Sequence, residues 1–253
     1  LTKLTWDNAA LLSPATADAL GVRQGDVMTV SVGDASIEIA ALPVPGIAEH
    51  VIVLPLGYGR RFDGRVCSGA GVDVYPLRSS HRSWEPASAV ATGATYPLAI
   101  TQMHFAVDST PGKGLQERLP MLFREGTLEQ YKADPKFAAH VGHTVHSLSM
   151  WEDQKQFEGA DYRWGMSIDL TTCTGCNACV TACQAENNIP IVGKDQVLRG
   201  REMHWLRIDR YCRFQETSPG QYDPDQPLSV ANQPLTCQHC ENAPCEQVCP
   251  VAA

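Results

Sequence analysis

The sequence predicts a mixed α+β protein, because three regions of the chain differ in composition. Residues 1–105 alternate short β-type stretches with turns and contain one cysteine, Cys67. Residues 106–160 are polar, helical in pieces and contain no cysteine. Residues 161–253 hold nine of the ten cysteines. We therefore expect a small N-terminal β-barrel, a helical connector and a C-terminal domain organised by its cysteines.

The clearest element signals stand near the start of the chain. In "SPATADALGV", Ser13 can cap a helix, Pro14 suits its first position and Gly21 suits its end. The next stretch, "GDVMTVSVGDASIEIAAL", alternates apolar and polar residues around a Gly33-Asp34 turn and predicts a hairpin. One face of its first strand would carry Met28, Val30 and Val32. We expect "VIVLPLGYGR" to form a buried strand that runs into a glycine loop.

The connector is expected to be helical in "TLEQYKADPKFAAHVGHTVHSL", with a break near Pro135. His140, His143 and His146 recur in it at steps of three residues. Such a spacing drifts around a helix, and no cysteine or carboxylate cluster accompanies these histidines. Metal or haem ligation by them is therefore the less favoured interpretation.

Composition excludes some classes of function. A hydrophobic content of 43% and a charged content of 19% are ordinary for a globular domain. The formal net charge of −8 argues against a nucleic-acid binder. No apolar run approaches the roughly 18–20 residues of a membrane span, so we expect no transmembrane segment in this chain. The chain begins without an initiator methionine and ends at "CPVAA" with no helix-end or turn signal, so we expect it to be a processed or truncated piece of a longer protein.

Two cysteine runs, "CTGCNACVTACQAENNIP" and "CQHCENAPCEQVCP", demand a covalent or metal explanation. Disulfides would suit an exported protein, but neighbours in C-x2-C are awkwardly placed to bridge each other. Zinc prefers two ligand pairs separated by a longer loop, whereas here three thiols share one loop. An iron–sulfur cubane accounts best for both runs, and Pro250 follows the last cysteine as in the bacterial ferredoxin motif. The predicted iron ligands are Cys173, Cys176, Cys179, Cys183, Cys237, Cys240, Cys245 and Cys249.

The count of eight thiols permits two 4Fe-4S clusters with reciprocal sharing. In that arrangement Cys249 completes the cluster of Cys173, Cys176 and Cys179. Cys183 then completes the cluster of Cys237, Cys240 and Cys245.

The remaining candidate residues have structural explanations that compete with functional ones. Cys212 and Cys67 stand outside both runs and are expected to be structural, Cys212 in a buried strand. His204 and His239 lie in or near the cysteine domain. His239 lies between two predicted ligands, and it is either a residue that tunes a cluster by a hydrogen bond or a surface histidine. Packing around the clusters is the expected role of Trp164, Trp205 and Tyr211. The "GYGR" stretch at 57–60 matches a phosphate loop only weakly and is expected to be barrel structure.

Residues 161–253 resemble a known family through "WGMSIDLTTCTGCNACVTACQAENNIP" and "QPLTCQHCENAPCEQVCPVAA". They are similar to the iron–sulfur subunit of bacterial alternative complex III and, more widely, to four-cluster ferredoxin subunits of molybdopterin oxidoreductases. The resemblance implies a ferredoxin-like 4Fe-4S domain that is incomplete at its C-terminus. Members have four cysteine runs, of which the first pairs with the fourth and the second with the third. This chain contains the first two, so the resemblance places the partner runs beyond it. The intact parent would then hold up to four clusters, one of them in a three-iron form.

The N-terminal region resembles a second family. "LLSPATADALGVRQGDVMTVSVG" followed by "VIVLPLGYGR" is similar to the last domain of molybdopterin enzymes, a double-psi β-barrel. Alternative complex III fuses such a part to the ferredoxin part, and there it carries no cofactor. The resemblance therefore implies no molybdopterin in this chain.

Together the resemblances imply electron transfer in a respiratory quinol-oxidising complex. Electrons would pass from integral membrane quinol-binding subunits toward cytochrome c subunits. The protein would lie peripherally on the bacterial cytoplasmic membrane, on the periplasmic side, and would have no catalytic site of its own. The alternative implied function is the electron-transfer subunit of a molybdenum-containing polysulfide- or sulfoxide-type reductase. A zinc-stabilised scaffold is a third interpretation, from a different class.

Overall fold

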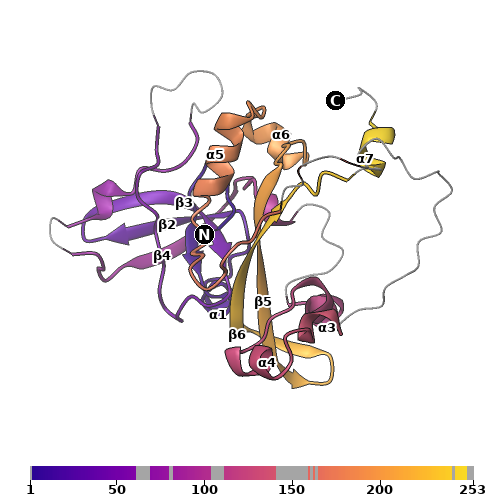
Figure 1. The fold of residues 1–253 in the computed structure, drawn as a ribbon. Helices are drawn as coiled ribbons and strands as arrows, with labels where there is room; N and C mark the ends of the chain where they lie inside the picture. The colour runs from indigo at the N-terminus through magenta and orange to yellow at the C-terminus, as the bar shows by residue number, and fades with distance from the viewer. Residues whose placement is uncertain are drawn as a thin grey trace. The chain divides into compact units, whose positions relative to one another are not determined.

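The computed structural model describes residues 2–60, 69–79, 82–103, 111–140, 159, 162, 165–240 and 243–249 (Figure 1). The chain forms two compact units, and neither is continuous in sequence. The first unit comprises Leu1–Arg118, Ile189–Met203 and Arg210–Ala231. The second unit comprises Leu119–Asn188, His204–Asp209 and Asn232–Ala253. The three consecutive domains expected from the sequence stay a prediction, since residues at both expected boundaries lie outside the described ranges.

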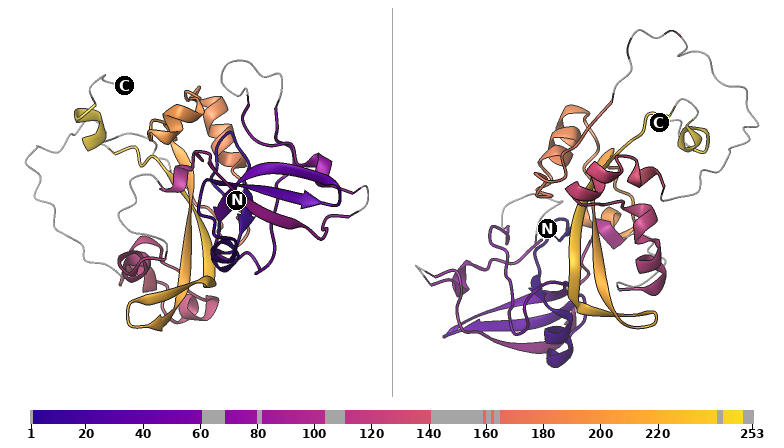
Figure 2. Two further views of the ribbon diagram at one scale, coloured as in Figure 1. Left: turned by 180° about the vertical axis from the view of Figure 1, so that it is seen from behind. Right: turned by 60° about the horizontal axis from the view of Figure 1, so that its bottom comes forward.

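A four-stranded sheet forms the body of the first unit, with strand order β1-β3-β2-β4. Its strands are β1 (Ala10–Leu12), β2 (Asp26–Val32), β3 (Ala35–Pro43) and β4 (Ser88–Thr95). β2 pairs in antiparallel fashion with β3 and β4, whereas β1 pairs with β3 in parallel. Strands β2, β3 and β4 lie side by side in Figures 1 and 2. The double-psi topology stays a prediction.

The predicted hairpin and helix are confirmed. Val32 faces Ala35 across the Gly33-Asp34 turn, and Gly33 has a positive φ of 57°, which glycine adopts without strain. Helix α1 (Pro14–Leu20) begins where Ser13 Oγ accepts a hydrogen bond of 3.1 Å from the Thr16 amide. It ends at Gly21, which is left-handed at φ 67°.

The core of the first unit consists of two hydrophobic clusters, one around Met28 and Val30 and another of Ala9, Ala40, Leu42, Val44 and Leu98. The first cluster contains the predicted strand face. Met28 and Val30 are at most 1% exposed, as their alternation with polar residues predicts, and Val32 packs at the edge of the same cluster. Their neighbours come from other strands and from the helix: Ala10, Leu12, Ala17 and Ile39. Burial of these side chains supplies the main stabilisation of the unit.

The prediction that residues 51–60 form a buried strand is wrong. Val53 forms one isolated bridge to Leu11, with backbone hydrogen bonds of 2.8 and 2.9 Å, and Val51 is 43% exposed. β1 offers only three residues for pairing, and Pro55 has no N–H to extend the ladder. The glycine loop that follows is closely packed, since a Cβ on Gly59 would lie 2.4 Å from the Asp73 backbone nitrogen.

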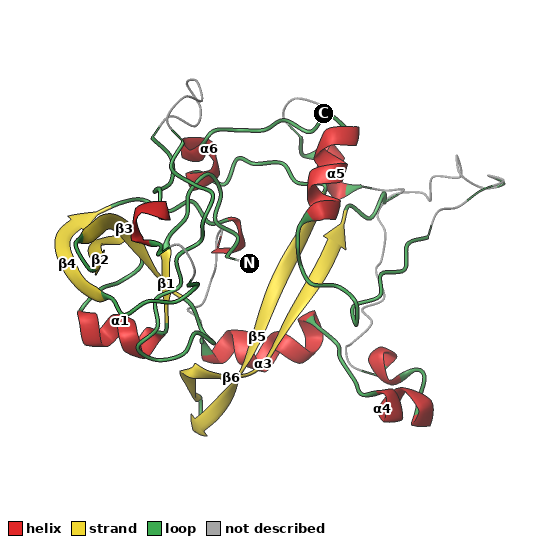
Figure 3. Ribbon diagram, turned by 90° about the vertical axis from the view of Figure 1, so that its left-hand side faces the viewer, coloured by secondary structure: helices red, strands yellow, loops and turns green. Residues whose placement is uncertain are grey.

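Strands β5 (Leu206–Ser218) and β6 (Gln221–Thr236) form a long two-stranded ribbon (Figure 3). Its residues are divided between the two units. On the edge of β5 that does not pair with β6, backbone groups make hydrogen bonds with a side chain. Gln116, in helix α3 (Lys113–Leu122), donates from Nε2 to the Cys212 carbonyl at 3.0 Å and accepts from the Phe214 amide at 3.0 Å. The side-chain amide thus takes the place of a neighbouring peptide group.

The remaining helices are short. Helix α4 (Leu128–Ala133) has a capping box formed by Thr127 and Gln130, and it ends before Pro135 as predicted. After the 3₁₀ turn Phe137–Ala139, His140 pairs with Asp134 at 3.0 Å, whereas His143 and His146 lie outside the described residues.

Two further 3₁₀ turns are Tyr75–Leu77 and Thr101–Met103. None of the helices in the described ranges is long and apolar enough to cross a membrane. Helices α5 (Ala178–Glu186) and α7 (Pro244–Gln247) carry cysteines of the two runs, and α6 (Lys194–Leu198) lies between them in sequence.

Candidate iron–sulfur site

Both cysteine runs lie in the second compact unit. In the first run, Cys173 and Cys176 stand on the loop before α5. Cys179 and Cys183 lie on α5 itself, four residues apart, so they share one helix face. The second run begins directly after β6 with Cys237 and Cys240 and continues through Cys245 in α7 to Cys249. None of the nine described cysteines is joined in a disulfide.

Two left-handed residues shape the first cysteine loop. Gly175 and Asn177 have φ angles of 67° and 64°, and Cys176 lies between them. Alternating turns of this kind direct backbone N–H groups toward one side, where they favour an anion. Accordingly, the backbone N–H of Ala178, and next the Thr174 hydroxyl, lower the pKa of the Cys176 thiol. The loop therefore favours a thiolate, the form in which cysteine binds metal.

Two features require glycine at position 175: its left-handed φ angle and a close contact with Asn232. A Cβ built there would lie 2.8 Å from both Cγ and Nδ2 of Asn232, on β6. The loop therefore packs directly against the strand from which the second cysteine run departs five residues later. Five residues of strand span about 17 Å.

A polar turn holds the chain just before Cys173. Asp169 Oδ1 accepts hydrogen bonds from the Thr171 backbone N–H at 2.9 Å and from the Thr171 hydroxyl at 2.7 Å. The Asp169 carbonyl accepts from the Thr172 hydroxyl at 3.1 Å. The hydrogen bonds from Thr171 lower the pKa of Asp169, so this carboxylate stays ionised. This Asx turn was not predicted, although "DLTT" is a sequence typical of one.

The second run is attached to the ribbon at its first cysteine. The Cys237 amide donates to the Trp205 carbonyl at 2.8 Å, next to the start of β5. His239 is exposed and left-handed at φ 48°, between Cys237 and Cys240. Its predicted role in tuning a cluster stays a prediction.

The thiols of the two runs are not assembled around a common centre. Across the described part of the chain, no three His, Cys, Asp or Glu side chains are grouped so that they would hold a metal ion. The pairings of the first run with Cys249 and of the second with Cys183 therefore stay predictions. The donor set nevertheless fits an iron–sulfur centre, because the first run combines thiols, a glycine contact and anion-favouring backbone groups on one loop.

Cysteines and aromatic residues outside the runs behave differently. Cys212 lies in β5, as predicted, and burial raises the pKa of its thiol, the opposite of Cys176. Trp205, just before β5, is 45% exposed. Tyr211 lies in β5, and the predicted packing of both residues around clusters stays a prediction. Cys67 and Trp164 lie outside the described residues.

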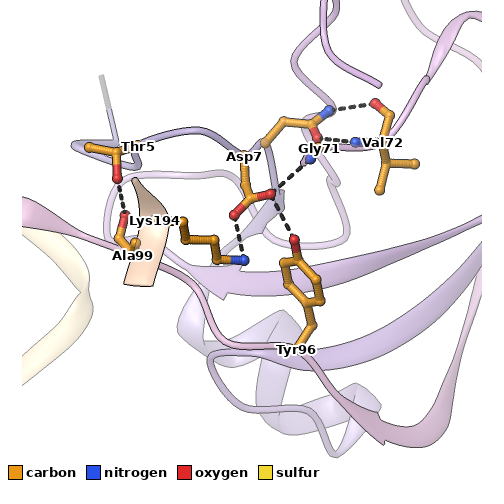
Figure 4. Close-up of polar contacts among 8 residues, drawn as sticks. Thr5, Asp7, Gly71, Val72, Tyr96, Ala99 and Lys194 are labelled. Atoms are coloured by element: carbon orange, nitrogen blue, oxygen red, sulfur yellow. Dashed lines mark hydrogen bonds and ion pairs between the residues drawn. The ribbon is translucent and has the colours of Figure 1, made fainter. Parts of the chain in front are cut away.

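The structure contains a buried charged cluster that the sequence does not predict (Figure 4). Asp7 is 1% exposed, and its Oδ2 lies 2.7 Å from Lys194 Nζ in α6. Its Oδ1 accepts hydrogen bonds from the Tyr96 hydroxyl at 2.9 Å and the Gly71 amide at 2.8 Å. Lys194 Nζ also lies 3.6 Å from the centre of the Tyr96 ring.

This cluster fixes the segment Ile189–Met203 within the first unit. A further bond runs from Trp6 Nε1 to the Val192 carbonyl at 3.2 Å. The segment joins the cysteine helix α5 to the β5–β6 ribbon in sequence. Because Asp7 and Lys194 are far apart in the chain, no local pattern signals their contact.

No protein-family model matches this chain. Several curated iron–sulfur subunits and related reductase subunits are similar to it over part of its length. It is 39% identical over 97 residues to the iron–sulfur cluster-binding subunit of menaquinone reductase from Nitratidesulfovibrio vulgaris, covering 38% of this chain and 34% of that subunit. It is 36% identical over 91 residues to the B subunit of polysulfide reductase from Wolinella succinogenes, covering 36% of this chain and 39% of that subunit.

A third relative is the iron–sulfur subunit of arsenate respiratory reductase from a Shewanella species, 35% identical over 91 residues, covering 36% of this chain and 31% of that subunit. The chain spans about a third of the length of these relatives. The predicted resemblance to iron–sulfur subunits of reductases is confirmed. The assignment to alternative complex III stays a prediction.

Proposed function

We propose that this protein transfers electrons through iron–sulfur clusters held by its two cysteine runs, as part of a membrane-associated respiratory oxidoreductase. The observation that carries the proposal is the first cysteine loop. Its left-handed residues and the hydrogen bonds that lower the pKa of Cys176 favour thiolate ligands on a loop that carries Cys173 and Cys176 and leads into Cys179 on α5. The similarity to subunits of three reductases supports the same chemistry.

The chain's own residues would act by ligation and by control of the environment. Cys173, Cys176 and Cys179 would hold one cluster, and Cys237, Cys240 and Cys245 a second. Cys183 and Cys249 are the candidate fourth ligands within this chain. A bound cluster supplies one-electron chemistry, and backbone N–H groups on the loop stabilise the negative charge of its ligands. No acid–base pair or nucleophile is needed for such a reaction, so this chain requires no catalytic residue.

The proposed parent assembly is alternative complex III. Two features of the chain support it: a sequence similar to a cofactor-free molybdopterin-enzyme domain, followed by a ferredoxin-type cysteine sequence. In that assembly, electrons from quinol oxidised by integral membrane subunits would pass toward cytochrome c on the periplasmic side. A second candidate is the electron-transfer subunit of a molybdenum-containing polysulfide-type reductase. The similarity to the B subunit of polysulfide reductase favours this candidate.

Metal and cofactor analysis of the purified protein tests the proposal. We expect iron and acid-labile sulfide in equal amounts, with no zinc and no pterin. Zinc without iron or sulfide would reject electron transfer in favour of a zinc-stabilised scaffold. Pterin together with iron, in a preparation of the intact complex, would favour the molybdenum reductase over alternative complex III.

A further inference from the structure

Asn232 brings a polar side chain against the first cysteine loop. It lies on β6 and is half-buried, within the same compact unit as the loop. The space in which a Cβ of residue 175 would lie is occupied by its amide, with Cγ and Nδ2 both at 2.8 Å from that position and Oδ1 at 3.0 Å. Every heavy atom of the amide group therefore lies against the loop, one residue from Cys176.

The side-chain amide of Asn232 has unused hydrogen-bonding groups. Within the described part of the chain, neither Nδ2 nor Oδ1 of Asn232 makes a hydrogen bond. An asparagine amide offers two N–H donors, and a half-buried donor gains free energy when it finds an acceptor. Cys173 and Cys176 lie on the same loop as Gly175, and the thiolate form of a cysteine is a hydrogen-bond acceptor.

The loop sequence is suited to this contact. Any residue other than glycine at 175 would displace the amide, and the left-handed φ of 67° independently favours glycine. The strand also limits the movement of Asn232, because its backbone is held in the β5–β6 ribbon. The amide is thus held close to the loop from an element outside it.

We propose that Asn232 is a positioning and tuning residue, whose side-chain amide donates a hydrogen bond to the sulfur ligands of the first cysteine run and raises the reduction potential of the cluster they hold. The inference rests on the proposed function. A donor to a thiolate withdraws negative charge, and reduction adds negative charge to the cluster, so the donor stabilises the reduced form more than the oxidised form.

Redox titration of the intact protein, followed by low-temperature EPR, tests this role. Asn232→Leu keeps the approximate size of the side chain and removes its donors, and Asn232→Asp replaces the donors with a negative charge. At fixed ambient potential we expect the ratio of reduced to oxidised cluster to fall about three- to tenfold in Asn232→Leu, tenfold being about 59 mV for one electron. The shift should be larger in Asn232→Asp.

Two further variants serve as controls. Asn232→Gln keeps an amide donor and should remain closer to the parent potential than Asn232→Leu. Gln226→Leu removes an exposed amide from the same strand and should leave the potential unchanged.

Three results would decide against the proposal, and they are distinguishable. Unchanged potentials in Asn232→Leu and Asn232→Asp, with iron content retained, would overturn the tuning role alone. Equal loss of iron in Asn232→Leu and Asn232→Gln would also overturn it, because packing rather than the amide donor would then explain the residue. Absence of iron and sulfide from the unsubstituted protein would reject the proposed function itself.

Discussion

Lys194 Nζ lies 2.7 Å from Oδ2 of Asp7, and this carboxylate is almost fully buried. The two residues stand in segments that are distant in sequence but belong to one compact unit. A buried ion pair is not by itself evidence of net stabilisation, but removal of one partner leaves a charge without compensation. The pair is therefore expected to hold the segment after the cysteine helix in place.

Lys194→Met should destabilise the protein by about 3 kcal/mol, because it leaves the Asp7 carboxylate buried without its cation. Urea denaturation followed by circular dichroism measures this change. The double variant Asp7→Asn with Lys194→Met should lose less than the sum of the single variants, since it removes both charges. Lys113→Met is the matched control, because Lys113 is 63% exposed beside Glu117 and should cost less than about 1 kcal/mol. Equal effects at 194 and 113 would contradict a structural role for the pair.

Gly175→Ala should reduce both cluster content and stability. The left-handed φ costs an alanine about 1–2 kcal/mol, and the new Cβ would displace the Asn232 amide. Iron analysis and urea denaturation of the same preparation measure the two effects. Gly165→Ala is the control, because nothing lies within 4 Å of a Cβ at that position. The same iron content in both variants would argue that the loop contact is dispensable.

Gln116→Leu should destabilise the protein by about 2 kcal/mol, because the buried Phe214 amide would lose its acceptor. Hydrogen exchange of the Phe214 amide reports the change directly and should accelerate. Gln226→Leu, at an exposed position of β6, serves as the control. Unchanged protection of the Phe214 amide would show that the side chain of Gln116 does not shield this edge.

Cysteine alkylation in cluster-free protein should depend on pH differently at two positions. The pKa of Cys176 is lowered by hydrogen bonds from the loop, so its reactive thiolate should form at lower pH than an ordinary thiol. The pKa of Cys212 is raised by burial, so its thiolate should form only at higher pH. Mass spectrometry of iodoacetamide-treated protein across a pH series measures both. Alkylation of Cys212 at lower pH than Cys176 would contradict the loop environment described above.

Local signals in the sequence predict local structure well in this chain. Ser13 and Gly21 determine the ends of α1 by hydrogen bonding and backbone freedom, and the Gly33-Asp34 turn sets the register of the hairpin. These features depend on residues a few positions apart. The cysteine spacing likewise predicts the chemistry of the site, because ligand geometry imposes it over short distances.

Features that depend on long-range contacts are not predicted from the sequence. The apolar run after Val51 has the composition of a buried strand, but it finds only one bridging partner, Leu11. Asp7 and Lys194 meet only after folding, and so do Gly175 and Asn232. Which thiols share a cluster is a question of the same long-range kind, and the spacing of the cysteines leaves its alternatives open.

The central claim is that the first cysteine run holds an iron–sulfur cluster. The most direct measurement is the low-temperature EPR spectrum of the reduced intact protein and of its Cys176→Ser variant, with Cys212→Ser as the control. We predict cluster signals in the parent, loss or change of one signal in Cys176→Ser, and a parent-like spectrum in Cys212→Ser. A parent protein without cluster signals, or a Cys176→Ser spectrum identical to that of the parent, would contradict the claim.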